Sequence, residues 1–266
     1  MGVIDFIILI CINRIRLVRR YIMKRSIAVI LAALTMAMML CACGGSSSNK
    51  LVMATNAAFP PYESVDGSTI IGIDPEIAQL IADDIGRELV IEDMAFDSVI
   101  AAVQTGKADI AMAGLTVTED RKKNIDFSIP YTEAAQVIIV KNGSTVKGPD
   151  DLKGMTIGVQ IGTTGDIYAA DIEDATIERY SKYFEAINAL LQDKIDAVIV
   201  DREPAKVFVN DNADLTLIDE EFTVEEYAIG VSKENTELLN QINASLKKLQ
   251  ESGKIDEIIN KYISAE

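Results

Sequence analysis

Short apolar segments alternate with segments of helical periodicity along most of this 266-residue chain. Such alternation favours sheets of mainly parallel strands, because parallel strands need a crossover connection and a helix is the usual one. The predicted strands are 51–54, 88–92, 109–113, 156–160, 177–180 and 197–200. The predicted helices open with Asp74 as the cap before Pro75, with Asp97 as a cap, at Thr163-Thr164 and at Phe184. The sequence therefore predicts an α/β fold.

A weak internal repeat indicates two similar α/β lobes. Residues 101–104 (AAVQ), a turn and Asp109 are echoed by residues 189–192 (ALLQ), a turn and Asp196. Any helix–turn–strand unit would look similar, so the repeat supports the two lobes without proving them.

Two extended apolar segments, 135–141 and 227–232, are predicted to link the lobes as a two-strand hinge. The C-terminal helices predicted at 237–250 and 254–263 would then return to the first lobe. The predicted division is 51–137 plus 231–266 for the first lobe and 138–230 for the second.

The N-terminal segment is typical of a signal peptide over residues 1–42. Lys24 and Arg25 precede an apolar run over 27–40, which is shorter than the roughly 20 residues of a membrane-spanning helix. Met23 begins a complete signal peptide, so we hypothesise that residues 1–22 come from a wrongly chosen start codon. The alternative is a short additional membrane-inserted segment. A trapped, uncleaved precursor that begins at Met1 would contradict the start-codon hypothesis.

The run ends in Leu40-Cys41-Ala42-Cys43, which resembles a bacterial lipobox with Cys43 as the lipidated residue. Cys41 fits less well, because it follows a leucine rather than a small residue. We therefore predict a lipoprotein in which 43–50 combine the lipidated cysteine with a flexible tether. The alternative is a plain secretory signal cut near Ala42, which leaves Cys43 as a free thiol.

Charge and composition exclude several classes of function. The first 42 residues hold six of the 25 basic residues and one of the 41 acidic ones, which leaves the remainder with a net charge near −21. A chain this acidic is not expected to bind nucleic acid, which requires cationic groups against the phosphates. The sequence has no histidine, and its three cysteines lie at or before Cys43. Histidine-based zinc sites and Ser-His or Cys-His catalysis are therefore excluded.

Polar and aromatic side chains follow the predicted strands, where the carboxyl ends of parallel strands form ligand sites. A zwitterion fits this inventory, because Arg121 offers a bidentate donor to a carboxylate and Asp201 offers an acceptor to an ammonium group. The helix that opens at Thr163-Thr164 adds backbone donors and a favourable dipole. Taken singly, Arg121 also fits a charged surface turn, and Asp201 also fits a helix cap.

Two segments resemble the polar amino-acid family, family 3, of ABC-transporter solute-binding proteins. They are Asn56-Ala57-Ala58-Phe59-Pro60-Pro61-Tyr62-Glu63 and Ala113-Gly114-Leu115-Thr116-Val117-Thr118-Glu119-Asp120-Arg121-Lys122-Lys123. Residues 125–128, 158–164 and 196–201 match further family segments, so the resemblance covers essentially all of 50–266. It implies a two-lobed periplasmic-binding-protein type II fold that closes on its ligand like a hinged trap.

The resemblance also implies roles for residues at the two ends of an amino acid. Arg121, Thr116 and Thr164 would hold the α-carboxylate. Asp201 and the Gly114 carbonyl would hold the α-ammonium group.

Other matching positions concern the ligand's side chain. Phe59 and Phe96 would flank it, although both rings also fit a core. Asn56 stands where family members that take basic amino acids often carry an acid, and Gln160 stands where glutamine binders resemble each other in having a lysine. The pocket is therefore predicted to be neutral and amide-lined, which favours a polar uncharged ligand or a broad range such as glutamine and cystine.

These observations predict a monomeric, lipid-anchored binding protein outside the cytoplasmic membrane. It would deliver a free amino acid to a cognate ABC permease and ATPase complex, with no cofactor, no metal and no catalytic residue. The alternatives are a ligand-sensing module for a membrane receptor and a fold-related periplasmic enzyme such as a dehydratase. The enzyme would need an acid/base pair in addition to Arg121 and Asp201, which are predicted to hold the ligand, and the sequence shows no clear candidate for it.

Overall fold

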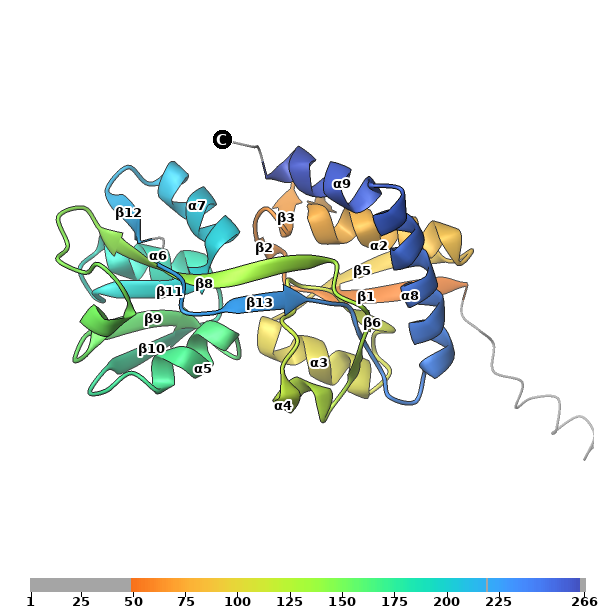
Figure 1. The fold of residues 1–266 in the computed structure, drawn as a ribbon, viewed down its shortest axis with the longest axis horizontal. Coiled ribbons are helices and arrows are strands. Elements are labelled where there is room, and N and C mark those ends of the chain that lie inside the picture. The colour runs from red at the N-terminus through yellow and green to blue at the C-terminus, as the bar shows by residue number, and fades with distance from the viewer. Residues whose placement is uncertain (1–48, 219, 264–266) are drawn as a thin grey trace, which may run out of the picture. The chain divides into compact units, whose positions relative to one another are not determined.

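The computed structural model describes residues 49–218 and 220–263, and this part forms two α/β lobes joined by extended strands (Figure 1). The predicted signal peptide (1–42), Cys43 and all but the last two residues of the predicted tether (43–50) lie outside the described residues. None of the described helices combines the length and the apolar character that a membrane span requires.

The first lobe is built on a five-stranded sheet. Its strand order is β5 (Glu88–Asp93), β1 (Lys50–Thr55), β6 (Ile110–Ala111), β14 (Gly230–Val231) and β7 (Asp126–Phe127). A three-stranded antiparallel sheet has the order β2 (Ala58–Phe59), β3 (Glu63–Asp66) and β4 (Thr69–Ile71). The helices are α2 (Ile73–Asp84), α3 (Phe96–Gln104), α4 (Glu119–Lys122), α8 (Thr236–Glu251) and α9 (Lys254–Tyr262).

The second lobe is built on a sheet with the order β10 (Thr176–Tyr180), β9 (Thr156–Gln160), β11 (Ala197–Asp201), β8 (Thr132–Lys141) and β12 (Leu215–Ile218). Its helices are η1 (Pro149–Leu152, a 3₁₀ helix), α5 (Thr164–Ala170), α6 (Tyr183–Leu191) and α7 (Arg202–Asp211). The two-lobed α/β fold is confirmed, but its sheets are mixed rather than mainly parallel. β8 and β14 run antiparallel to the β-strands beside them, because each comes from a segment that crosses between the lobes.

The internal repeat has a structural counterpart in the two sheets. The Asp109 carboxylate accepts a hydrogen bond from the Val52 backbone N–H at 2.8 Å, and the Asp196 carboxylate accepts one from the Thr156 N–H, also at 2.8 Å. In return, the N–H of each aspartate donates to the carbonyl of the same partner residue. Each aspartate therefore fixes the entry of a strand beside its parallel neighbour, once in each lobe.

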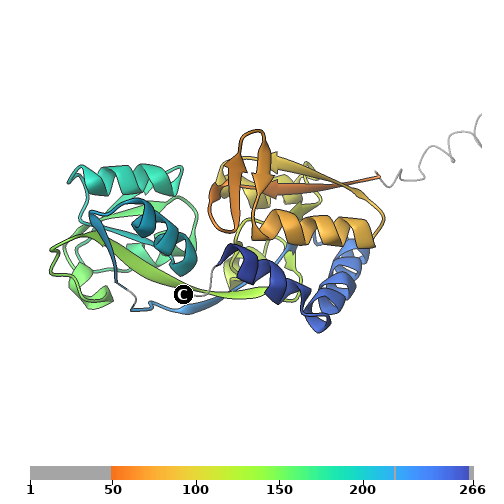
Figure 2. The same cartoon turned by 90° about the horizontal axis from the view of Figure 1, so that it is seen from above.

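Two paired strands pass between the lobes. β8 is antiparallel to β13 (Val224–Tyr227) over the register from Ala135↔Val224 to Thr132↔Tyr227, and both strands run from one lobe to the other (Figures 1 and 2). β14 follows β13 directly and enters the first sheet. The predicted two-strand link is thus present, whereas the exact lobe boundaries at 137/138 and 230/231 stay a prediction.

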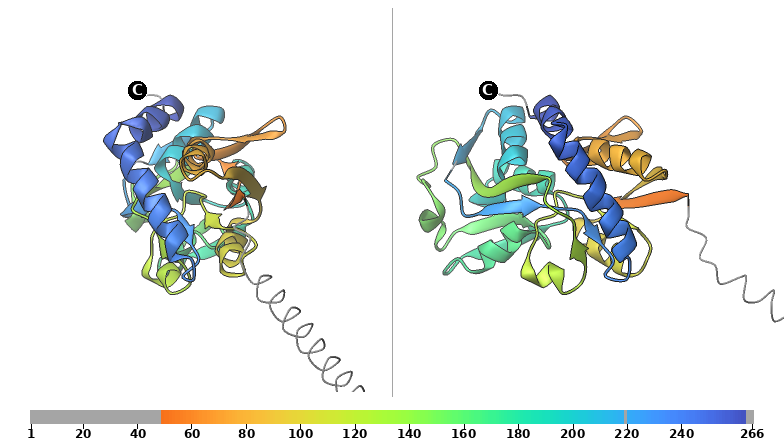
Figure 3. Two further views of the ribbon diagram at one scale, coloured as in Figure 1. Left: turned by 90° about the vertical axis from the view of Figure 1, so that its right-hand side faces the viewer. Right: turned by 45° about the vertical axis from the view of Figure 1, so that its right-hand side comes forward.

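The C-terminal helices complete the first lobe. Both α8 and α9 contact α2, and α8 lies along the outside of this lobe (Figure 3). Their buried positions, Leu238, Ile242, Leu246, Ile255 and Ile258, recur at three- and four-residue spacing, so each helix presents one apolar stripe to the core.

Two predicted helix caps were wrong. Asp74 lies within α2, whose N-cap is Gly72, and Asp97 lies in the first turn of α3 rather than at its cap. The Asp74 side chain is instead completely buried, where it accepts hydrogen bonds from the Gly114 N–H at 2.9 Å and the Tyr131 hydroxyl at 2.8 Å. The Asp74 carboxylate, which the local sequence suggests as a helix cap, therefore binds residues distant in the sequence instead. The helix predicted to open at Thr163-Thr164 is confirmed as α5, and the hydroxyl of its N-cap Thr163 accepts from the Asp166 N–H.

Candidate functional site

A small, largely filled pocket lies between the two lobes and is lined by residues of both. All ten residues singled out from the sequence line it. They are Asn56, Phe59, Phe96, Gly114, Thr116, Arg121, Gln160, Thr163, Thr164 and Asp201. Two further lining residues, Glu63 and Ala113, were not singled out.

Arg121 occupies the short helix α4 and reaches both lobes with its guanidinium group. Its Nη1 donates to the Thr116 carbonyl at 2.7 Å, and its Nη2 donates to the Gly162 carbonyl at 3.1 Å. The guanidinium carbon lies 5.4 Å from the Phe96 ring centroid. The side chain is buried, so the surface-turn alternative is wrong. Burial lowers the pKa of Arg121 below its ordinary value, whereas the Glu225 and Asp201 charges act in the opposite direction.

Asp201 ends β11 and precedes α7, but its side chain does not cap that helix. It accepts instead a hydrogen bond from the Tyr227 hydroxyl and is almost fully buried. Burial, and secondarily the negative charge of Glu225, raises the pKa of Asp201 to about 7. This carboxyl group is thus poised to change its protonation near neutral pH.

The hydroxyls of Thr116 and Thr164 point at a residue that the sequence analysis missed. Both donate to Oε2 of the buried Glu225, at 2.9 and 3.0 Å. A hydroxyl has one proton to give, so these threonines can donate to a further acceptor only through their backbone N–H groups. Thr163 points elsewhere, since its hydroxyl donates to the Gln160 carbonyl at 2.8 Å. Buried and exposed residues alternate along β13 in the structure, but its sequence has two adjacent glutamates, so no sequence signal marks Glu225 as the buried one.

Two amides close the pocket from opposite lobes. The Gln160 Nε2 donates to Asn56 Oδ1 and to the Ser181 carbonyl, both at 2.9 Å. The Asn56 Nδ2 in turn donates to the Met94 carbonyl at 2.7 Å. This wall of the pocket is therefore neutral, as the sequence predicts.

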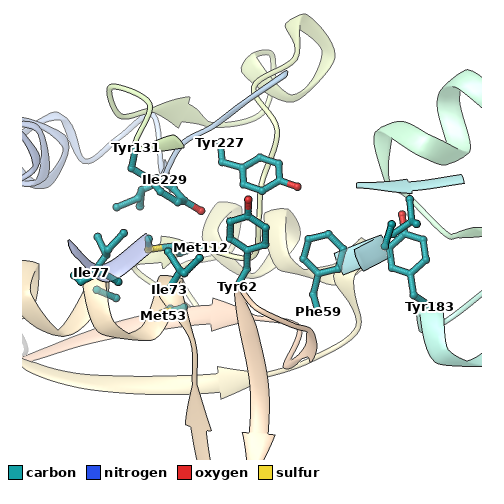
Figure 4. Packing of buried hydrophobic residues seen from close by; sticks show 14 of the residues in the cluster. Met53, Phe59, Tyr62, Ile73, Ile77, Met112, Tyr131, Tyr183, Tyr227 and Ile229 are labelled. Carbon is teal, nitrogen blue, oxygen red and sulfur yellow. The ribbon is translucent and has the colours of Figure 1, made fainter. Parts of the chain in front are cut away.

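Aromatic rings meet across the lobes next to the pocket. Phe59 stacks on Tyr62 with ring centroids 5.9 Å apart and on Tyr183 of the second lobe at 5.7 Å (Figure 4). Tyr62 packs edge-on against Tyr227 at 5.0 Å. Phe59 is thus both a core residue and a residue of the pocket lining, so the two predicted roles are not exclusive.

Gly114 needs its lack of a side chain. Its φ of 54° lies in the left-handed region, and a Cβ atom there would stand 2.8 Å from the Phe59 ring. Its N–H is held by Asp74, which fixes the direction in which the following backbone leaves the pocket.

Two further buried carboxyl groups, those of Glu63 and Asp74, lie next to each other at the pocket. Glu63 is completely buried next to Asp74, and neither Glu63 oxygen has a hydrogen-bond partner among the described residues by distance and angle. Burial, followed by the neighbouring Asp74 charge, raises the pKa of Glu63 well above its ordinary value. Burial also raises the pKa of Asp74 to about 6. Burial thus favours the neutral, protonated form of Glu63 over a full charge on the pocket wall.

One buried guanidinium group and one buried carboxyl group thus face the same small pocket, with aromatic rings and neutral amides between. A molecule with a carboxylate and an ammonium group has the complementary charge pattern. The described residues contain no group of three or more His, Cys, Asp or Glu side chains arranged to hold a metal ion.

Comparisons with known proteins agree with this geometry. Residues 51–265 match the family described as bacterial extracellular solute-binding proteins, family 3. A probable histidine-binding protein of Neisseria gonorrhoeae is 34% identical, covering 92% of this chain and 97% of the relative. The glutamine-binding protein GlnH of Bacillus subtilis is 31% identical, covering 91% and 98%.

Solved structures give the same result. Holo ArgBP from T. maritima is 40% identical with a TM-score of 0.74, covering 81% of this chain and 96% of that chain. An ancestral arginine-binding protein bound to glutamine is 37% identical with a TM-score of 0.76, covering 82% and 99%. These relatives are binding proteins and not enzymes, which removes the dehydratase alternative. The chain belongs to the bacterial extracellular solute-binding proteins of family 3.

Proposed function

We propose that the chain binds a free α-amino acid between its lobes and delivers it to an ABC permease. Arg121 holds the carboxylate and Asp201 the ammonium group, and the carrying observation is that these two buried, oppositely charged groups face one pocket. Hydrogen bonds to charged groups contribute about 1.5–3 kcal/mol each, so a few of them reach the ~8 kcal/mol of a micromolar complex. Thr116 and Thr164 offer backbone N–H groups to the carboxylate, and the Gly114 carbonyl accepts from the ammonium group. Phe59 and Phe96 flank the ligand's side chain.

The preferred ligand has a polar side chain without net negative charge, as in glutamine or cystine. Asn56 and Gln160 give the side chain neutral partners, and Glu63 gives it a buried carboxyl group that a cationic group could ionise. The Asp201 carboxylate in the lining opposes a ligand whose side chain has a net negative charge, because like charges at close range repel strongly when buried. Relatives named for glutamine, L-cystine, arginine and histidine support a broad polar range.

A thermal-shift screen of the purified protein with the common amino acids and cystine tests this proposal. A ligand at 100 times its Kd stabilises the fold by about 2.7 kcal/mol, which raises Tm by roughly 5–10 °C for a chain of this size. We expect such shifts with glutamine, cystine or basic amino acids and none with aspartate or glutamate. If no amino acid raises Tm, the proposed function fails; if only the acidic ones do, the charge argument fails.

Cys43 is proposed to carry the lipid that anchors a monomeric chain to the outer side of the cytoplasmic membrane. Replacing Cys43 by alanine should abolish labelling with a radioactive fatty acid and move the protein from the membrane to the soluble fraction. The neighbouring Cys41→Ala is the matched control, and it should keep both the label and the membrane association. Label retained in Cys43→Ala but lost in Cys41→Ala would reverse the assignment.

A further inference from the structure

One oxygen atom joins both lobes and both linking strands at the edge of the pocket. Glu225 lies on β13, and its Oε2 accepts from Thr116 of the first lobe and Thr164 of the second lobe. It also accepts from the Gln136 Nε2 on β8 at 3.2 Å. Glu225 and Gln136 are both buried, with 5% and 0% of their surface exposed.

The strand register explains why these groups meet. Glu225 stands opposite Ala134 on β8, and Gln136 lies two residues further along the same strand. Residues two apart in a strand point to the same face, so the Glu225 and Gln136 side chains share one face of the linking ribbon. Gln136 is also the register partner of Asp201 on β11. The ribbon therefore carries Glu225 to the place where the two lobes meet.

Only a closed arrangement of the lobes can satisfy all three donors. Thr116 precedes α4 in the first lobe, whereas Thr164 opens α5 in the second. Rotation of one lobe about β8 and β13 would separate these threonines and leave Glu225 with fewer partners. A buried carboxylate that loses its partners is costly, so the hydrogen bonds favour the closed state.

We propose that Glu225 is a positioning residue that holds the lobes closed around the bound amino acid, through the hydroxyls of Thr116 and Thr164. It acts without contact to the ligand and sets how long the ligand stays. This inference rests on the proposed function only where the dissociation rate of an amino acid is measured. How far the lobes are open in the ligand-free protein tests it independently of any ligand.

The test compares the rates of binding, measured by stopped-flow fluorescence or surface plasmon resonance with L-glutamine, L-arginine and L-cystine as probes. Glu225→Ala should raise the dissociation rate by about tenfold or more, the size expected for lost hydrogen bonds to a charge, and leave the association rate within about twofold. Glu225→Gln keeps an acceptor oxygen and should restore most of the slow dissociation. The exposed neighbour on the same strand, Glu226→Ala, is the control and should bind like the parent protein.

A double-mutant cycle with Thr164→Val separates positioning from general destabilisation. Thr164→Val should itself speed dissociation, both by removing the Thr164–Glu225 bond and by removing the bond that Thr164 Oγ1 accepts from Gln136 Nε2 at 3.2 Å. The double variant with Glu225→Ala should dissociate less fast than the sum of the two single effects predicts, because the Thr164–Glu225 bond is shared. Additive effects would overturn the proposal, as would a Glu225→Gln variant that dissociates as fast as Glu225→Ala.

Small-angle X-ray scattering of the ligand-free protein completes the test. Glu225→Ala should have a larger radius of gyration than the parent protein or Glu226→Ala, and Glu225→Gln should not. Unchanged scattering in Glu225→Ala would overturn the closing role even if binding were altered. If the parent protein binds no amino acid, the proposed function fails, and the scattering result alone decides the role of Glu225.

Discussion

Replacing Arg121 with alanine should weaken amino-acid binding by a factor of about 100, since two charge-assisted hydrogen bonds at about 1.5 kcal/mol each are lost. The guanidinium group is buried and already oriented by the Thr116 and Gly162 carbonyls, so little ordering is needed when a carboxylate arrives. Isothermal titration calorimetry with the strongest ligand of the thermal-shift screen measures the loss. The affinity of Arg121→Lys should lie between those of the parent protein and Arg121→Ala, because lysine keeps the positive charge without the planar, bidentate guanidinium group.

Arg179→Ala provides the control for this loss. Arg179 is an exposed arginine of the second lobe whose Nε lies 2.8 Å from Asp166, and exposed ion pairs of this kind contribute little. It should keep the parent affinity within about twofold. Parent-like binding by a folded Arg121→Ala would show that another group holds the carboxylate.

Lowering the pH from 8 to 5 should weaken binding, with a slope that approaches tenfold per pH unit once the pH is below about 7. Asp201 must be ionised to pair with an ammonium group, and its pKa is raised to about 7 in the ligand-free protein. The ammonium group favours the ionised form and lowers this pKa in the complex, so binding releases a proton at pH values below 7. Affinity is therefore full above pH 7 and falls as the pH drops.

The Asp201→Asn variant distinguishes the contribution of Asp201 to the pH dependence of affinity from that of other groups in the site. The variant should bind at least about tenfold more weakly at pH 8, because a charge-assisted bond is lost, and its affinity should be nearly constant between pH 8 and 6.5. Calorimetry in buffers of different ionisation enthalpy counts the released protons directly. The same pH profile in Asp201→Asn as in the parent would assign the titration to another group.

The sequence predicted the parallel strands of both sheets, the helices between them and the ten lining residues, because these depend on local patterns. The short strands β2, β3, β4, β7 and β12 were not predicted. Arg121 and Asp201 both follow strand ends, and the carboxyl ends of parallel strands meet at one edge of a sheet. The family resemblance then indicated that Arg121 and Asp201 bind a ligand and are not ordinary surface charges. The hydrogen bond that turns the Asp201 side chain from α7 towards Tyr227 could be found only from the structure.

The missed residues depend on partners far away in the sequence. Glu225 binds Thr116, 109 positions earlier, and Asp74 binds the Gly114 N–H, 40 positions later. No local pattern distinguishes Glu225 and Glu63 from the many other acidic residues of the chain. Asp74 was misassigned for the same reason, since an aspartate before a proline has the same local appearance whether it caps a helix or lies buried.

The position of β14 in the first sheet has a consequence for the order in which the chain folds. β7 joins that sheet only through β14, whereas β10, β9, β11, β8 and β12 of the six-stranded second sheet all lie between Thr132 and Ile218, and only β13 follows them. As the chain emerges from the ribosome, five strands of the second sheet are available before the first sheet receives the strand that unites β6 with β7. The lobe that begins first is thus the last to be finished, and a pocket able to close on a ligand arises only after β13 and β14 have been made.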